Sequence, residues 1–445
     1  YRRYYPAGEV TGHVLGFTNV DDGGQEGLEL AYDHWLAGED GAKRVIQDNL
    51  GRIVQDVESI RPVRPGRDML LSVDMRIQYL AYRELKAAIQ ANRARSGSAV
   101  VIDVTTGEVL AMVNQPTFNP NDREQLKPAG YKNRAATDLV EPGSSIKPFV
   151  VAAGLASGLY NASSVIDTSP GMIKVGLKVI EDHHNLGAVD LATVLAKSSN
   201  VGMTHIALNL GPERIYSTLS KLGFGQVTTS GYPGESAGLL TNYSRWRPIT
   251  TATVAYGYGL SVTPLQLAHA YATLGAGGIS RPITFVKVDH PVPGERVLPE
   301  QVSRDVVHML ESVVSNIGTG KRASIAGYRV AGKTGTAWKS SIGGYSTNRY
   351  LAVFAGVAPA TNPRLATVVV IDEPSAGLYY GGDVSAPVFA GIMGGALRLM
   401  AVAPDAPLEQ TRDEMPASPM PEDPPPVDLP PSTTVAQRAN AGARR

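Results

Sequence analysis

The stretch DLVEPGSSIKPFVVAAGL, residues 138–155, places a Pro-Gly turn, two serines and a lysine directly before an apolar run. Pro148 is compatible with the first turn of a helix, where the missing N–H costs little. Residues three apart share a helix face, so Ser144 and Lys147 are expected to point the same way. A serine hydroxyl needs a base to remove its proton, and a buried lysine with a lowered pKa can be that base. The stretch therefore predicts a nucleophile and its base at the start of a buried helix.

A second polar motif lies in LATVLAKSSNVGMTHIALNL, residues 191–210. Ser198, Ser199 and Asn200 interrupt two apolar helical runs, so a polar turn is expected between apolar walls. Such a turn can aim a hydroxyl and an amide into a cleft. An ordinary helix–helix connection is the alternative, just as Ser-x-x-Lys alone is a motif that a chain of this length contains by chance.

The third motif is VAGKTGTAW, residues 330–338, which is typical of a strand. It offers a cation, two hydroxyls and a glycine at which a ligand backbone can approach closely. An exposed strand edge could also pair with an extended peptide. A strand with a surface lysine is the alternative. The residues concerned are Lys333, Thr334, Gly335 and Thr336.

Taken in order, Ser-x-x-Lys, Ser-x-Asn and Lys-Thr-Gly resemble the motif set of the penicillin-binding proteins and serine β-lactamases. EPGSSIKPF, the block at 255–278 and the run at 4–41 look like class B penicillin-binding proteins. Within that class, DEPSAGLYYGG and SAPVFAGIMGGALRLM favour the division-specific, FtsI-like (penicillin-binding protein 3) type. One departure is Trp338, where relatives can carry a basic residue.

The order of elements predicts an α+β fold in which an antiparallel sheet carries helices packed on it. We expect a helix after Asp74, a hairpin over 98–114 and a mainly helical middle. Three strands and a closing helix capped by Ser385 follow, and the first strands join the last in one sheet. The resemblance adds a small N-terminal pedestal domain. The expected boundaries are 1–66 for the C-terminal part of a dimerisation-type pedestal, 67–400 for the penicillin-binding transpeptidase domain, and 401–445 for a disordered tail with ten prolines.

The resemblance implies that this chain cross-links peptidoglycan as a serine-type D-alanyl-D-alanine transpeptidase. Ser144 would attack the penultimate D-alanine carbonyl, and Lys147 would be the base. Ser198 would relay a proton to the leaving amine, while Asn200 would hold the substrate amide and orient Lys147. Backbone N–H groups of Ser144 and Thr336 would form the oxyanion hole.

The resemblance also assigns substrate binding. The terminal carboxylate would be bound by Lys333, Thr334 and Thr336, and Gly335 is a further substrate-binding candidate. Three tyrosines match family aromatics near the acyl pocket, although plain packing is the alternative for them. They are Tyr345, Tyr379 and Tyr380.

Composition limits the cofactors and partners. The formal net charge is zero, which gives no basic surplus for nucleic acid, and the absence of cysteine excludes thiolate chemistry. The pair His183-His184 has no further ligand pattern, so no metal and no cofactor are expected. The implied partners are peptidoglycan stem peptides on nascent lipid-linked glycan, β-lactams as covalent inhibitors, and division-machinery membrane proteins including a SEDS-type glycosyltransferase.

The expected location is the periplasmic face of the bacterial inner membrane. No window approaches the roughly 20 apolar residues that span a bilayer. Because the chain begins at Tyr1 without an initiator methionine, we interpret it as a fragment whose N-terminal transmembrane anchor is missing.

Four other functions stay open on the sequence alone. A β-lactamase or β-lactam sensor shares the nucleophile, but no Glu-x-x-Leu-Asn segment lies between Ser198 and Lys333. A D,D-carboxypeptidase would replace the acceptor amine by water. An elongation-specific class B relative would do the same chemistry with other partners. A scaffold that only binds division partners is disfavoured by the intact motif set.

Overall fold

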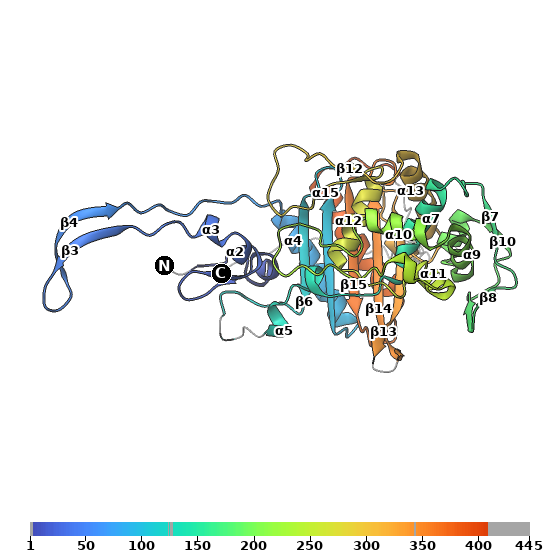
Figure 1. The fold of residues 1–445 in the computed structure, drawn as a ribbon, viewed down its shortest axis with the longest axis horizontal. Helices are drawn as coiled ribbons and strands as arrows, with labels where there is room; N and C mark the ends of the chain where they lie inside the picture. Colours follow the sequence, from blue (N-terminus) through green and yellow to red (C-terminus); the bar gives the residue numbers. More distant parts are fainter. Residues whose placement is uncertain (1–2, 123, 125–127, 342–343, 408–445) are drawn as a thin grey trace, which may run out of the picture. The chain divides into compact units, whose positions relative to one another are not determined.

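A five-stranded sheet forms the centre of the computed structural model, which describes residues 3–122, 124, 128–341 and 344–407. Its order is β13-β14-β15-β5-β6, and every neighbouring pair is antiparallel. Strands from the two ends of the chain, blue and orange in Figure 1, lie side by side, as predicted. The strands are β5 (Ser96–Asp103), β6 (Val109–Gln115), β13 (Ala331–Ser341), β14 (Gly344–Ala358) and β15 (Leu365–Asp372).

Alternate residues of the strands enter two separate cores, because successive side chains of a strand point to opposite faces. Val100 and Ile102 of β5 pack into one core, and Ala99 and Val101 pack into the other. The second core is closed by α4 (Met75–Ala91) and α15 (Ala386–Leu399), where the rings of Phe354 and Phe389 lie 4.7 Å apart.

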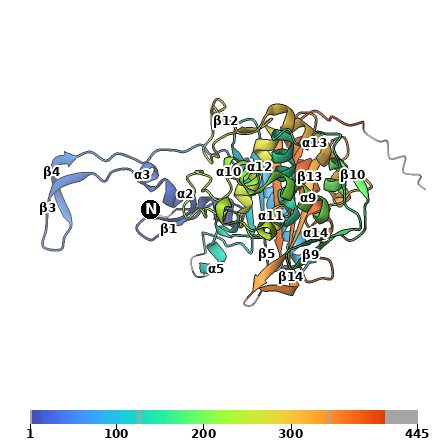
Figure 2. The same ribbon diagram turned by 45° about the vertical axis from the view of Figure 1, so that its right-hand side comes forward.

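The first core carries the helical layer, which Figure 2 shows in green and yellow around α9, α11 and α12. Its members are α6 (Arg134–Thr137), α7 (Lys147–Ala156), α8 (Leu191–Ala196), α9 (Asn200–Leu210), α10 (Pro212–Lys221), α11 (Pro248–Val254), α12 (Pro264–Gly275) and α13 (Glu300–Val314). Short elements complete this part: α5 (Pro128–Tyr131), β7 (Val165–Asp167), β8 (Met172–Val175), β9 (Lys178–Glu181), β10 (Ala188–Asp190), β11 (Ile279–Ser280), β12 (Glu295–Arg296) and α14 (Gly381–Val384).

Local capping signals gave mostly correct helix starts. Asp74 caps α4 by accepting a hydrogen bond from the Arg76 N–H, and Thr263 forms a capping box with Gln266 at α12. Ser385 is the exception: its hydroxyl donates to the Ala352 carbonyl oxygen at 3.0 Å and makes no cap. The prediction that Ser385 caps the closing helix is therefore wrong, because β14 offers a buried acceptor.

The N-terminal region consists of two kinds of structure. Val14 and Leu28 join the core beneath the helical layer, so the first elements pack on the rest of the chain. They are α1 (Gly12–Leu15), β1 (Phe17–Thr18), β2 (Gly24–Glu26), α2 (Gly27–Ala31) and α3 (Asp33–Leu36). In contrast, β3 (Ala42–Gln47) and β4 (Ile53–Arg61) form a separate two-stranded sheet of almost wholly exposed residues. The domain boundary at residue 66 stays a prediction.

The predicted tail begins with ordered residues. The Tyr328 hydroxyl donates to the Val402 carbonyl oxygen at 2.7 Å, and the Arg329 N–H donates to Asp405 at 2.7 Å. The rest of the predicted tail, 408–445, lies outside the described residues. Among the helices that the structure describes, none combines the length and the apolar character needed to cross a membrane.

Candidate active site

Ser144 lies in a 3-10 turn, η3 (Gly143–Ile146), from which α7 continues at Lys147. The turn is fixed through its other serine: the Ser145 hydroxyl donates to the Pro142 carbonyl oxygen at 2.7 Å, and the Ser145 carbonyl oxygen accepts from Tyr271 at 2.9 Å. Ser145 is fully buried, whereas Ser144 is half-buried. The backbone therefore presents Ser144 alone of the two serines to a ligand.

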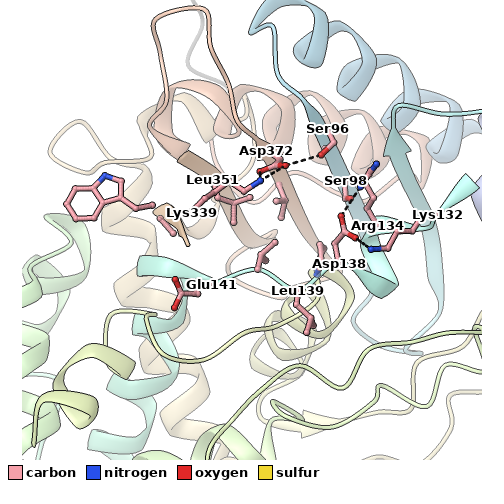
Figure 3. Close-up of a pocket in the computed structure, with 16 residues that line it drawn as sticks. Ser96, Ser98, Lys132, Arg134, Asp138, Leu139, Glu141, Lys339, Leu351 and Asp372 are labelled. Atoms are coloured by element: carbon pink, nitrogen blue, oxygen red, sulfur yellow. Dashed lines mark hydrogen bonds and ion pairs between the residues drawn. The ribbon is translucent and has the colours of Figure 1, made fainter. Parts of the chain in front are cut away.

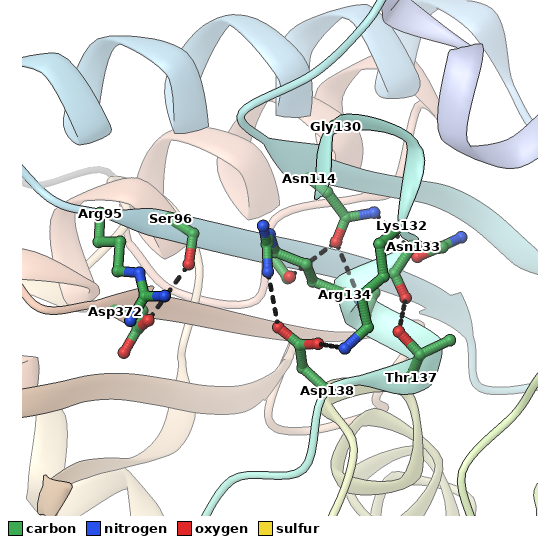
Figure 4. A network of polar contacts seen from close by, with 12 residues as sticks. Arg95, Ser96, Asn114, Gly130, Lys132, Asn133, Arg134, Thr137, Asp138 and Asp372 are labelled. Atoms are coloured by element: carbon green, nitrogen blue, oxygen red, sulfur yellow. Dashed lines mark hydrogen bonds and ion pairs between the residues drawn. The ribbon is translucent and has the colours of Figure 1, made fainter. Parts of the chain in front are cut away.

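The segment that leads into this turn is held by a polar network (Figure 4). Asn114 of β6 donates to the Asn133 side chain at 2.8 Å and accepts from the Ala135 N–H at 2.8 Å. Arg134 pairs with Asp138 at 3.1 Å. These contacts tie the approach to the nucleophile to the central sheet.

Gly257 supports the turn from the opposite side. The Gly143 N–H donates to the Gly257 carbonyl oxygen at 3.2 Å, and Gly257 has a φ of +92°. A Cβ at Gly257 would lie 2.0 Å from the Gly143 carbonyl oxygen, so no other residue fits without moving the turn.

We expect Gly257→Ala to slow acylation by a penicillin more than about 10-fold, because displacing the nucleophile by ~1 Å has a large effect on rate. Gly259→Ala is the matched control, since Gly259 has a φ of +80° but no atom nearer than 3.9 Å to an added Cβ. The control should lose only about 1–2 kcal/mol of stability from the left-handed backbone. Equal acylation rates in the two variants, measured by stopped flow, would contradict the proposed support.

The second motif meets the first at Lys147. Ser198 lies between α8 and α9, as predicted, with a φ of +57°. The Lys147 ammonium nitrogen Nζ donates to the Ser198 carbonyl oxygen, to Ser198 Oγ at 3.1 Å and to Asn200 Oδ1 at 2.9 Å. Three acceptors from one turn therefore fix the direction of the lysine side chain.

The third motif meets the other two at the same hydroxyl. Lys333 lies on β13, the edge strand of the sheet, and its Nζ donates to Ser198 Oγ at 3.0 Å. Ser198 Oγ thus lies between the two lysine nitrogens. Lys147, Ser198, Asn200 and Lys333 form one hydrogen-bond network. Within the described part of the chain, no hydrogen bond joins Ser144 Oγ to this network, and such contacts often tighten only when substrate binds.

Burial changes the acidity of both lysines. Both are fully buried, and loss of water lowers the pKa of Lys333 to about 7. Burial also lowers the pKa of Lys147 well below its ordinary 10.5; the charge of Lys333 lowers it further, and Asp182 opposes the shift. Lys147 can therefore lose its proton, and so become a base, at a lower pH than an ordinary lysine.

The remaining substrate-binding candidates lie around β13. Thr334 shares a hydrogen bond of 2.7 Å with Thr319, and Thr336 accepts from the Gly381 N–H at 3.0 Å. Gly335 is packed closely: a Cβ there would lie 2.8 Å from the Pro142 carbonyl oxygen. The strand and the nucleophile turn are thus in direct contact.

The three tyrosines divide into two groups. Tyr345 donates to Glu141 at 3.0 Å and packs edge-on against Tyr258, with ring centroids 5.2 Å apart. Tyr379 and Tyr380 pack against each other with tilted rings, 4.4 Å between centroids, and Tyr380 directly precedes Gly381. Their role in substrate binding stays a prediction.

A cavity of about 330 Å³ lies next to this region (Figure 3). Its lining includes Glu141, three residues before the nucleophile, and Trp338, two residues after Thr336. Its three cationic side chains each pair with a carboxylate of the lining, as for Lys339 and Asp372 at 2.7 Å. Across the described residues, no group of three or more His, Cys, Asp or Glu side chains could hold a metal ion.

Sequence reasoning missed Asp182, which accepts the Asn200 N–H at 2.5 Å. It lies in the EDHHN segment, where the adjacent histidines draw attention and both are exposed. No spacing rule connects a single aspartate to a helix that begins 18 residues later, so the sequence held no usable signal.

Comparison with known proteins identifies the group to which this arrangement belongs. Residues 97–394 match the family described as the penicillin binding protein transpeptidase domain. The chain belongs to the penicillin-binding protein transpeptidase family. Residues 1–71 of this transpeptidase match the penicillin-binding protein dimerisation domain.

The relatives of this transpeptidase include FtsI proteins, which confirms the predicted resemblance. It is 50% identical over 405 residues to the peptidoglycan D,D-transpeptidase FtsI of Escherichia coli K12, covering 91% of this chain and 68% of that protein. FtsI of Buchnera aphidicola is 39% identical over 404 residues, covering 91% and 71%. The apo transpeptidase domain of Burkholderia pseudomallei penicillin-binding protein 3 superposes with a TM-score of 0.71 at 41% identity, covering 77% of this chain and 100% of that one.

Proposed function

We propose that this penicillin-binding protein cross-links peptidoglycan stem peptides in septal cell-wall synthesis through an acyl-enzyme on Ser144. The observation that carries the proposal is the chain Lys147–Ser198–Lys333, in which one hydroxyl joins two buried lysines at 3.1 and 3.0 Å. Such a chain can move a proton without water. The FtsI-type relatives support the D,D-transpeptidase reaction.

In the acylation step, neutral Lys147 takes the Ser144 proton while Oγ attacks the carbonyl of the penultimate D-alanine. The C–N bond to the terminal D-alanine breaks, and its amine receives a proton through Ser198. The N–H groups of Ser144 and Thr336 stabilise the oxyanion, and each such donor contributes about 3 kcal/mol to transition-state stabilisation. The amine of a second stem peptide then attacks the ester carbonyl and gives its proton to Lys147. The C–O bond to Ser144 breaks, and Lys147 passes the proton to Ser144 Oγ.

Substrate binding follows from the position of β13 at the sheet edge. The strand pairs with β14 on one side only, so an extended stem peptide can add along the other side. Lys333 in its charged form, with Thr334 and Thr336, would bind the terminal carboxylate. Asn200 Oδ1 accepts from Lys147, and the Asn200 amide nitrogen, which makes no hydrogen bond among the described contacts, would orient the peptide.

The pH dependence of acylation by a penicillin should be bell-shaped. The second-order rate constant, which includes penicillin binding, rises as Lys147 loses its proton, at a pH well below 10.5, because burial and Lys333 lower its pKa. It falls again as Lys333, with a pKa of about 7 in the free enzyme, loses the charge that binds the carboxylate. Lys333→Arg keeps the charge, so its alkaline fall should move to higher pH. A profile of acylation rate against pH without this movement would contradict the assignment.

The function is tested by intact mass after incubation with a penicillin, followed by turnover of a synthetic stem peptide with and without an acceptor amine. We expect one stable adduct per chain and a cross-linked product when the acceptor is present. Rapid loss of the adduct would indicate a β-lactamase, and release of D-alanine without cross-linking would indicate a carboxypeptidase.

We place the proposed reaction at the periplasmic face of the inner membrane, because this is where the enzyme would encounter stem peptides and β-lactams. We further propose that the N-terminal region binds division-machinery membrane proteins, including a SEDS-type glycosyltransferase. Localisation of a fluorescent fusion decides this: a midcell band supports the septal role, and a side-wall pattern supports the elongation-specific alternative.

A further inference from the structure

Asp182 lies directly after β9, at the N-terminus of α9. Its Oδ1 accepts hydrogen bonds from the Asn200 N–H at 2.5 Å and from the Val201 N–H at 3.1 Å. Its Oδ2 accepts from the Ser199 hydroxyl. One carboxylate therefore binds three consecutive residues of the turn that carries Ser198 and Asn200.

This turn has an unusual backbone. Ser198 has a φ of +57°, in the left-handed region that residues other than glycine seldom adopt. Such a conformation persists only where several contacts determine it, and it is common at functional sites. Ser199 supplies one contact, because its hydroxyl also accepts from the Gly202 N–H at 2.8 Å. Asp182 supplies the others from outside the helix.

The same turn directs Lys147. The Ser198 carbonyl oxygen, Ser198 Oγ and Asn200 Oδ1 all accept from the Lys147 Nζ, so a shift of the turn shifts the base. The carboxylate also interacts favourably with the positive end of α9. Asp182 itself has no hydrogen bond to Lys147, Lys333 or Ser144 among the described contacts.

We propose that Asp182 is a positioning residue for acylation, which holds the Ser198–Asn200 turn so that both side chains face Lys147. This inference rests on the function proposed for Ser144. Asp182 would act through Ser198 and Asn200, which contact Lys147. It also links β8 and β9, which precede Asp182, to the geometry of the base.

The charge of Asp182 gives the proposal a readout that a purely structural role would not affect. Two charged groups act on Lys147: Lys333 from β13 and Asp182 from the segment after β9. The negative carboxylate favours protonated Lys147. Its neutralisation should therefore lower the pKa of Lys147 and move the acid limb of acylation to lower pH.

The test compares Asp182→Asn with wild type over a range of pH. We expect the maximum acylation rate by a penicillin to fall about 10- to 100-fold, as for other misplaced catalytic groups, and the acid limb to move to lower pH. Asp182→Glu keeps the negative charge on a longer side chain. Its maximum acylation rate should therefore fall, while the acid limb of the pH profile stays in place. Intact mass gives the reactive fraction, so that misfolded protein is not counted as slow protein.

Asp74→Asn is the matched control, because Asp74 also caps a helix, α4, on the other face of the sheet. Its acylation rate and acid limb should equal those of wild type. The inference would be overturned if Asp182→Asn had the acylation rate and the acid limb of wild type. It would also be overturned if the variant only formed less reactive protein, and the reactive protein acylated at the wild-type rate. A wild-type protein that forms no adduct would instead overturn the proposed function.

Discussion

Ser144→Ala should abolish covalent labelling by penicillin, with acyl-enzyme formation slowed by about 10⁴-fold or more. The neighbouring hydroxyls of Ser145 and Ser198 are poorly placed to replace the nucleophile. The Ser145 hydroxyl is buried and donates to the Pro142 carbonyl oxygen, and Ser198 Oγ is held between two lysine nitrogens. Intact mass after incubation measures the result directly, and cross-linking of stem peptides should disappear in parallel.

Ser145→Ala is the control for this change, because it alters the adjacent serine of the same turn. It removes one buried hydrogen bond, with a cost of about 1 kcal/mol, and leaves Ser144 in place. The adduct should therefore persist. An adduct on Ser144→Ala, or cross-linking without one, would show that the nucleophile is elsewhere.

Lys147→Met should slow acylation by about 10²- to 10⁴-fold, the range that a general base contributes. Methionine keeps much of the buried volume but cannot accept the Ser144 proton. Because Lys333 and β13 remain, non-covalent binding of penicillin should change little. Stopped-flow measurements that separate binding from acylation should place the loss in the acylation step.

Lys333→Met provides the contrast, since the proposed carboxylate contact belongs to Lys333. Lys333→Met should weaken non-covalent binding of penicillin more than it lowers the rate constant of the acylation step. Lys197→Met alters an exposed lysine beside the same turn and should leave both steps unchanged. A Lys147→Met protein that acylates at the wild-type rate would exclude Lys147 as the base.

Much of the fold could be predicted because its signals are local. The Asp74 and Thr263 caps depend on hydrogen bonds within three residues, and the hairpin of β5 and β6 depends on two apolar runs around a turn. The joining of first and last strands followed from the order of elements. Ser385 failed as a cap because a distant strand supplied a better acceptor for its hydroxyl.

For the site, the sequence by itself determined which residue types were present and, through their motifs, the family. Only the tertiary structure decided how they meet. Lys333 reaches Ser198 across 135 positions because β13 lies at the sheet edge beside the helical layer. Neighbours distant in the chain also lower the pKa values of Lys147 and Lys333. In the same way, Asp182 accepts a hydrogen bond from the first residue of α9, 18 positions further along the chain. Burial and charge are sums over all surrounding groups, which no local pattern of residues contains.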